Sequence, residues 1–155
     1  MIQRLQSLYL LFVVILCLIL FRGSILSFTD GTGNAVKLMI NGSLTGQNGL
    51  AAGQVANMWP VPAILILISL LSLTAIFLFK NRKMQLTVTI VIIILSAGLI
   101  TALACYGFNV ISNFKMKIAP GLIMAVPLFI LVFSVLACRG ILKDDRLVKS
   151  YDRLR

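Results

Sequence analysis

Residues that could carry out chemistry are scarce in this chain. Its 155 residues include no His, and its four acidic residues are all aspartates, Asp30, Asp144, Asp145 and Asp152. Acid–base catalysis and metal binding both rely on clusters of such side chains, and the sequence holds no glycine-rich nucleotide-binding motif. We therefore expect the chain not to be an enzyme and to bind no metal and no cofactor.

The sulfur and hydroxyl side chains offer little more. Cys17, Cys105 and Cys138 fall inside or at the edge of apolar runs, where cysteine usually behaves as a small buried hydrophobe. Hydroxyl groups in such runs commonly bond to carbonyls of their own helix, and a transport path would usually add ionisable residues or broken helices. The hydroxyls in the runs belong to Ser69, Ser72, Thr74, Thr87, Thr89, Ser96, Thr101 and Tyr106.

The overall composition is that of a membrane protein. Hydrophobic residues make up 60% of the sequence, charged residues 12%, and the mean hydropathy is +1.06. A soluble domain could not bury so much apolar surface. The net charge of +10 comes from cations at the ends of apolar runs rather than from an exposed basic surface, so we expect no nucleic-acid partner.

Four polar residues, 80–83, separate two charge-free apolar runs at 61–79 and 86–108. Each run has the roughly 20 residues that a helix needs to cross about 30 Å of hydrocarbon. Two further helices are predicted at about 5–26 and 118–138. The expected fold is an all-α membrane protein, a four-transmembrane-helix bundle over residues 1–138. Pro127 lies inside the last predicted helix and should bend it.

The first run allows two interpretations. Arg4 followed by an apolar run resembles a signal peptide, but the run is long for one and no convincing cleavage site follows it. We expect a retained helix that continues toward Phe28, with a cleaved signal as the alternative.

Residues 27–60 form the one larger outer loop of this prediction. Val36, Leu38 and Ile40 alternate with Ala35, Lys37 and Met39 before Asn41-Gly42, the usual pair of a tight hairpin turn. The loop is therefore either a short β-hairpin or an irregular glycine-rich segment. Trp59 and the prolines after it predict a clean helix start.

Small residues line one face of the third helix at four-residue spacing. Because small side chains let helices approach closely, we expect this face to pack helices within the chain or between copies. It comprises Ala97, Gly98, Thr101 and Ala102.

The cations predict the orientation. Ten of the 14 Lys and Arg residues lie on one side of the predicted spans, which places both termini in the cytoplasm. We expect five of them to lie near anionic lipid headgroups: Lys80, Arg82, Lys83, Arg139 and Lys143.

Residues 139–155 form a polar but patterned tail. Leu147, Tyr151 and Leu154 share one helical face, so a short amphipathic cytoplasmic helix is predicted. It either lies on the inner leaflet or docks a cytoplasmic protein. In the docking interpretation the contact residues are Leu147, Tyr151, Arg153 and Arg155.

The two ends together carry a family resemblance. They are MIQRLQSLYL at residues 1–10 and KDDRLVKSYDRLR at residues 143–155, and they resemble a Bacteroidota family of four-helix membrane proteins, domain-of-unknown-function family 4293. The resemblance covers essentially the whole chain. It implies a multi-pass protein of the bacterial inner membrane and supplies no activity.

These observations favour a non-catalytic accessory or scaffold subunit of a larger membrane complex, with a protein partner in the membrane or cytoplasm. The alternative is a small transporter, a channel-like protein or a lipid-binding membrane protein.

Overall fold

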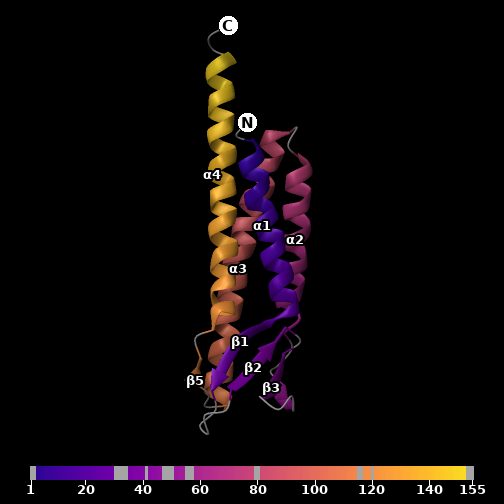
Figure 1. The fold of residues 1–155 in the computed structure, drawn as a ribbon, viewed down its shortest axis with the longest axis vertical. Helices are drawn as coiled ribbons and strands as arrows, with labels where there is room; N and C mark the ends of the chain where they lie inside the picture. The colour runs from indigo at the N-terminus through magenta and orange to yellow at the C-terminus, as the bar shows by residue number, and fades with distance from the viewer. Residues whose placement is uncertain are drawn as a thin grey trace.

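In the part of the chain that the structure describes, four helices form a bundle capped at one end by a small sheet (Figure 1). The computed structural model describes residues 3–29, 35–40, 42–46, 51–54, 58–78, 81–114, 117–119 and 121–152. The elements are α1 (Gln3–Arg22), β1 (Ser24–Thr29), β2 (Ala35–Met39), β3 (Ser43–Gly46), β4 (Ala51–Gln54), α2 (Pro60–Phe77), α3 (Arg82–Phe114), β5 (Lys117–Ile118), the 3-10 helix η2 (Leu122–Ala125) and α4 (Val126–Asp152).

The helices form a ring. Helix α1 packs against α2 and α4, and α3 packs against the same two helices from the other side. Helix α1 begins and α4 ends at the end of the bundle opposite the sheet (Figure 1), which we call the terminal end. The other end is the sheet end.

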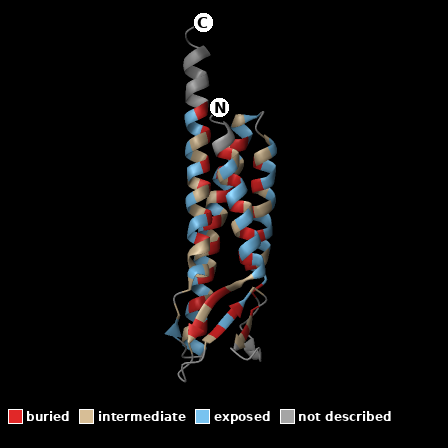
Figure 2. Cartoon of the chain, in the orientation of Figure 1, coloured by how far each residue is buried: buried red, intermediate tan, exposed pale blue. Residues whose placement is uncertain are grey.

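The outward faces of the helices are exposed along the bundle (Figure 2), and many of their exposed residues are large hydrophobic side chains. Leu18 of α1, Leu70 of α2 and Ile94 of α3 are all more than half exposed. Helices α2, α3 and α4 are long and apolar enough to cross a membrane, and α1 contains a shorter apolar stretch, Gln6–Arg22. Apolar side chains on the outside of apolar helices are what a bilayer requires, so the predicted membrane class is confirmed in this coarser form.

Helix α1 ends earlier than predicted. The expected helix ran to residue 26 and toward Phe28, but α1 stops at Arg22 and the chain continues as strand β1. Ile25, Leu26 and Phe28 are buried in this strand. Their apolar character, which suggested a longer helix, reflects burial in a sheet.

The sheet is larger than the predicted hairpin. Its five described strands are antiparallel in the order β4-β3-β2-β1-β5. The hairpin itself is confirmed: β2 pairs with β3, and Gly42, at a φ of 77°, donates its N–H to the Met39 carbonyl at 2.9 Å. Val36 and Leu38 of β2 are buried while Lys37 and Met39 are exposed, as the alternation predicts.

The helix boundaries near the bend agree with the sequence to within a few residues. Helix α2 begins at Pro60, directly after Trp59, and ends at Phe77; α3 begins at Arg82. Helix α3 is longer than the predicted 86–108, and its 33 residues span about 50 Å. Its second half therefore continues past the end of α1 and lies beside β1.

The predicted bend at Pro127 is wrong. Residues 117–118 pair with β1 as strand β5, η2 follows, and Pro127 is the second residue of α4. A proline in the first helical turn removes an N–H that has no helical partner anyway, so it starts the helix instead of bending it.

The predicted tail at 139–155 is not separated from the fourth helix. Helix α4 does not end at residue 138 but continues unbroken to Asp152. Its last part extends beyond the start of α1 and the bend between α2 and α3 (Figure 1).

Candidate functional site

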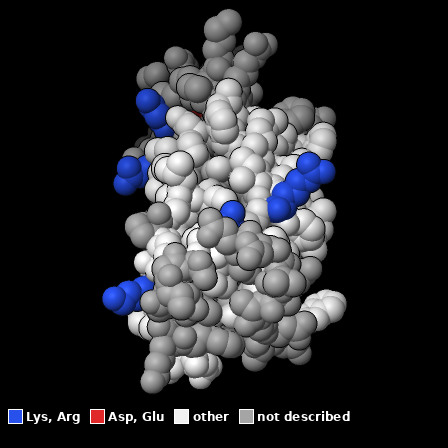
Figure 3. Space-filling view, turned by 60° about the horizontal axis from the view of Figure 1, so that its bottom comes forward, with Lys and Arg blue, Asp and Glu red and all other residues white. Residues whose placement is uncertain are grey.

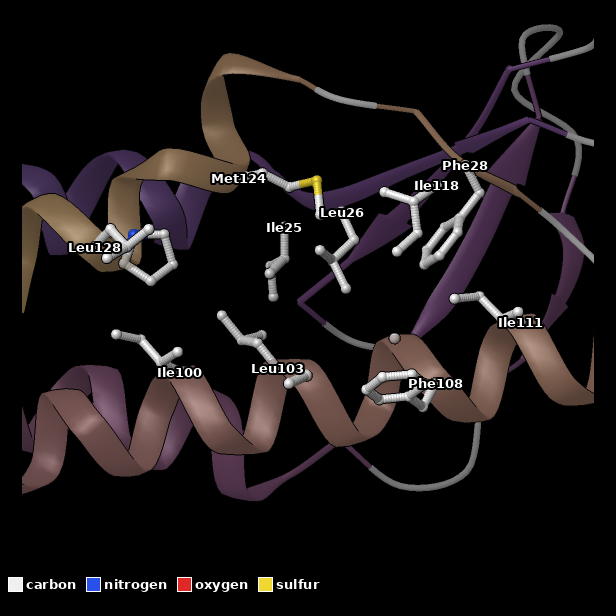
Figure 4. A pocket seen from close by; sticks show the side chains of 13 residues that line it. Ile25, Leu26, Phe28, Ile100, Leu103, Phe108, Ile111, Ile118, Met124 and Leu128 are labelled. Atoms are coloured by element: carbon white, nitrogen blue, oxygen red, sulfur yellow. The ribbon is translucent and has the colours of Figure 1, made fainter.

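A cavity of about 270 Å³ lies at the sheet end, between the C-terminal half of α3, the sheet and the start of α4 (Figure 4). It forms because α1 ends at Arg22 while α3 continues, so β1 and η2 close the space that a longer α1 would fill. The described residues of its walls carry hydrocarbon side chains and one thioether, together with a glycine. The lining residues are Ile25, Leu26, Phe28, Ile100, Leu103, Ala104, Gly107, Phe108, Ile111, Ile118, Met124, Pro127 and Leu128.

A second feature, the polar cluster of Gln6, Arg82 and Asp144, lies at the terminal end. The Gln6 side-chain amide donates from Nε2 to Oδ2 of Asp144. The Arg82 guanidinium donates from Nη1 to the backbone carbonyl of Asp144 at 3.2 Å. Gln6 and Asp144 are 5% and 7% exposed. The cluster therefore joins α1, α3 and α4 through polar groups that water scarcely reaches.

Gly140 makes room for this cluster. It lies one turn before Asp144 on α4, and a Cβ added there would lie 2.9 Å from Cγ of Gln6. A side chain at residue 140 would therefore push Gln6 away from Asp144.

A buried amide also joins α2 to α3 near the bend. Gln85 is 3% exposed and donates from Nε2 to the Ala75 carbonyl at 3.1 Å. Together with Gln6 and Asp144, it concentrates the buried hydrogen-bonding capacity at the terminal end. The side-chain hydrogen bonds of Gln6, Arg82 and Gln85 that join helices thus lie at the terminal end, whereas the cavity at the sheet end has an apolar lining.

Most hydroxyls of the spans bond to their own helix, as predicted. Ser69, Thr74, Thr87, Thr89, Ser96 and Thr101 each donate to a carbonyl three or four residues earlier. Ser72 is the exception, because its buried Oγ has no partner in the described part of the chain.

In the described part of the chain, the predicted small-residue face lies toward the outside of the bundle. Ala97 and Thr101 are exposed, Ala102 is half-buried, and a Cβ at Gly98 would meet nothing within 4 Å. The helix buries a different stripe toward the ring, which includes Thr89, Ile92, Ser96 and Leu99. Packing between copies stays a prediction.

Four of the five predicted headgroup cations belong to the described residues, and they lie toward the terminal end. Lys83, Arg139 and Lys143 are exposed, Arg82 belongs to the polar cluster, and Lys80 lies outside the described residues. On the face shown in Figure 3, which is turned so that the sheet end comes forward, the Lys and Arg side chains lie apart from one another.

The predicted contact residues are only partly described. Leu147 and Tyr151 lie in the extended end of α4, but their side chains lie outside the described part. Arg153 and Arg155 lie outside it altogether. The docking interpretation therefore stays a prediction.

Neither the cavity nor the polar cluster was predicted from the sequence. Gln6 interrupted the first apolar run, and Asp144 lies seven residues after the buried Ala137 and three after the buried Ile141. That helical spacing would have placed Asp144 on the inner face of α4. Among the described residues, no group of three or more His, Cys, Asp or Glu side chains could hold a metal ion.

Comparison with known proteins gives a family and no activity. No curated protein matches the chain. The family described as a domain of unknown function, DUF4293, matches residues 2–154, nearly the whole chain, as the two ends of the sequence predicted. The chain therefore belongs to the DUF4293 family.

Proposed function

We propose that this protein is a non-catalytic accessory or scaffold subunit of a larger complex in the bacterial inner membrane, with four spans and both termini in the cytoplasm. The observation that carries the proposal is the extension of α4. At Asp144 the helix is hydrogen-bonded to α1, and it continues to Asp152. Eight further residues extend it by about 12 Å.

The sequence of α4 beyond Asp144 suits binding to a protein partner. A helix that lies in a groove presents apolar residues at spacings of three and four, and Leu147, Tyr151 and Leu154 follow that spacing. Four cations accompany them: Arg146, Lys149, Arg153 and Arg155. We therefore expect an apolar groove with an acidic rim on the partner.

The orientation can be tested with two exposed lysines from opposite ends, Lys37 of β2 and Lys83 of α3. Each is replaced by cysteine in a background whose native cysteines are alanine. In spheroplasts, a maleimide that cannot cross the membrane should label Lys37→Cys, and it should label Lys83→Cys only after lysis. The opposite pattern would invert the proposed topology.

The docking role is tested by replacing Leu147 and Tyr151 together with aspartate. Truncating a hot-spot residue of an interface typically costs 2 kcal/mol or more of binding free energy. The affinity for the partner, and with it the recovered amount, should therefore fall by about 30-fold or more. The measurement is quantitative mass spectrometry of proteins that copurify with the chain.

The matched control is Arg146→Ala with Lys149→Ala, which lowers the net charge by the same two units but keeps the apolar face. If the helix docks a protein through that face, the control should retain most of the partner. Equal loss in both variants would assign the helix to the anionic membrane surface instead. An unchanged set of associated proteins in the first variant would refute the docking role.

A further inference from the structure

The cavity at the sheet end crosses the level at which the hydrocarbon of a membrane would end. A helix crosses about 30 Å of hydrocarbon in roughly 20 residues. Counted from the buried Gln85 near the start of α3, that level falls near Cys105. Counted back from the buried Asp144 on α4, it falls near Met124. The two counts agree with each other, because both end at the cavity. Ala104, next to Cys105, and Met124 both line it.

The cavity begins inside the hydrocarbon and ends beneath the sheet. Ile100 and Leu128 lie on the hydrocarbon side of this level, whereas Ile111 and Ile118 lie beyond it. Figure 4 shows the same arrangement, with Ile100 and Leu128 facing each other at one end of the space and Ile111 and Ile118 at the other. A ligand of the cavity would therefore run along α3 from the bilayer toward the sheet.

The cavity opens on the faces of the helices that contact lipid. Its floor is buried, since Leu26, Phe28 and Leu103 are at most 7% exposed. Its rim includes Ala104 of α3 and Leu128 of α4, which are both exposed. A hydrocarbon chain could therefore enter from the bilayer without passing through water.

The lining excludes a polar ligand. Among the described lining residues there is no charged, hydroxyl or amide side chain, and a polar group placed beside them would lose its water without gaining a hydrogen bond from their side chains. Apolar cavities of this kind stay dry and bind apolar molecules, because filling them restores the packing contacts that the walls lack.

The volume of the cavity and the cation beside it indicate which kind of apolar ligand fits. About 270 Å³ is just below the range of roughly 300–1,000 Å³ typical of drug-sized ligands, which suits one chain better than a whole two-chain lipid. Lys117 is exposed one residue before Ile118, which puts a cation at headgroup level. We propose that this cavity binds one acyl chain of a phospholipid from the leaflet next to the sheet. This site is independent of the docking role of α4.

The test uses the full chain in vesicles of phosphatidylethanolamine and phosphatidylglycerol. A small fraction of the phosphatidylethanolamine carries a photoactivatable diazirine at the end of one acyl chain. After illumination, mass spectrometry maps the crosslinked residues. Bulk lipid can reach Leu70 on the outside of α2, which is 54% exposed. Leu26 and Phe28 of β1 should be crosslinked only by a chain inside the cavity.

Two glycines of α3 supply a matched pair of variants. A Cβ at Gly107 would lie 3.6 Å from Cδ1 of Leu26, an ordinary contact, whereas one at Gly98 would meet nothing within 4 Å. Gly107→Leu therefore fills the cavity, and Gly98→Leu adds the same side chain to the same helix outside it. We expect Gly107→Leu to lower β1 crosslinking at least tenfold relative to Leu70, and Gly98→Leu to leave the ratio unchanged.

Ala104→Leu gives a second variant if Gly107→Leu fails to fold. Ala104 is exposed on the rim, so a larger side chain there narrows the mouth without disturbing the core. It should lower the crosslinking ratio at least threefold. The proposal is overturned if the unmodified protein gives no crosslink on β1, or if the folded cavity variants give the same ratio as Gly98→Leu.

Discussion

Replacing Gln6 with leucine should lower the free energy of unfolding by about 3 kcal/mol. The substitution removes the side-chain donor that Asp144 has in this structure and leaves a carboxyl group that is 7% exposed. Hydrogen bonds to charged groups contribute about 1.5–3 kcal/mol, and an unsatisfied buried partner adds its desolvation cost. Denaturant titration in mild detergent measures the change.

The control for this prediction is a double-mutant cycle. Asp144→Leu alone should cost about 1–2 kcal/mol, because it leaves the amide of Gln6 buried without its acceptor. Gln6→Leu with Asp144→Leu removes both polar groups and should come within about 1 kcal/mol of the unmodified protein. Arg82 donates to the backbone carbonyl of residue 144, so its hydrogen bond survives the substitution. Simple additivity of the two single changes would mean that the bond does not couple α1 to α4.

Replacing Gly140 with leucine should destabilise the bundle by about 2–4 kcal/mol. The new Cβ would lie 2.9 Å from Cγ of Gln6, which is the middle of that side chain rather than a flexible tip. Gln6 must therefore move, and its hydrogen bond to Asp144 breaks while α1 and α4 are pushed apart. Overpacking alone typically costs 1–3 kcal/mol, and the lost bond adds to it.

Gly98→Leu is the control for this change as well. It adds the same side chain to a helix at a position where a Cβ meets nothing, and replacing an interior helical glycine gains up to about 1 kcal/mol of helix propensity. Gly140→Leu should therefore lower the free energy of unfolding, whereas Gly98→Leu should raise it. A Gly140→Leu protein as stable as Gly98→Leu would contradict the tight contact between α1 and α4.

The helices could be predicted because membrane spans have a local signature. Charge-free runs of sufficient length identified all the long helices, the cations at 80–83 identified the bend, and Trp59 with Pro60 identified the start of α2. Each of these signals depends on residues close together in the sequence.

The sheet and the polar cluster depend on distant contacts and were therefore only partly predictable. The hairpin at Gly42 is local and was predicted, but β1 is a strand because Phe28 pairs with Val36 on one side and with Ile118 on the other. Local sequence allowed a helix there. Likewise, Gln6 and Asp144 are 138 residues apart, so nothing in the sequence pairs them.

The cavity had no signal in the sequence. Its walls come from β1, α3, β5, η2 and α4, and each contributes apolar residues that equally suit a filled core or a lipid-facing surface. Only the early end of α1 and the greater length of α3 leave the space open.

The central claim is that this chain works as an accessory subunit, and purification from native membranes tests it most directly. A tag inserted between β3 and β4, within residues 47–50, leaves both ends of the chain free. Mass spectrometry and particle-size analysis in gentle detergent then give the composition of the complex. We predict a second protein in fixed stoichiometry, which is lost when Leu147 and Tyr151 become aspartate. A lone chain or a homo-oligomer would contradict the account.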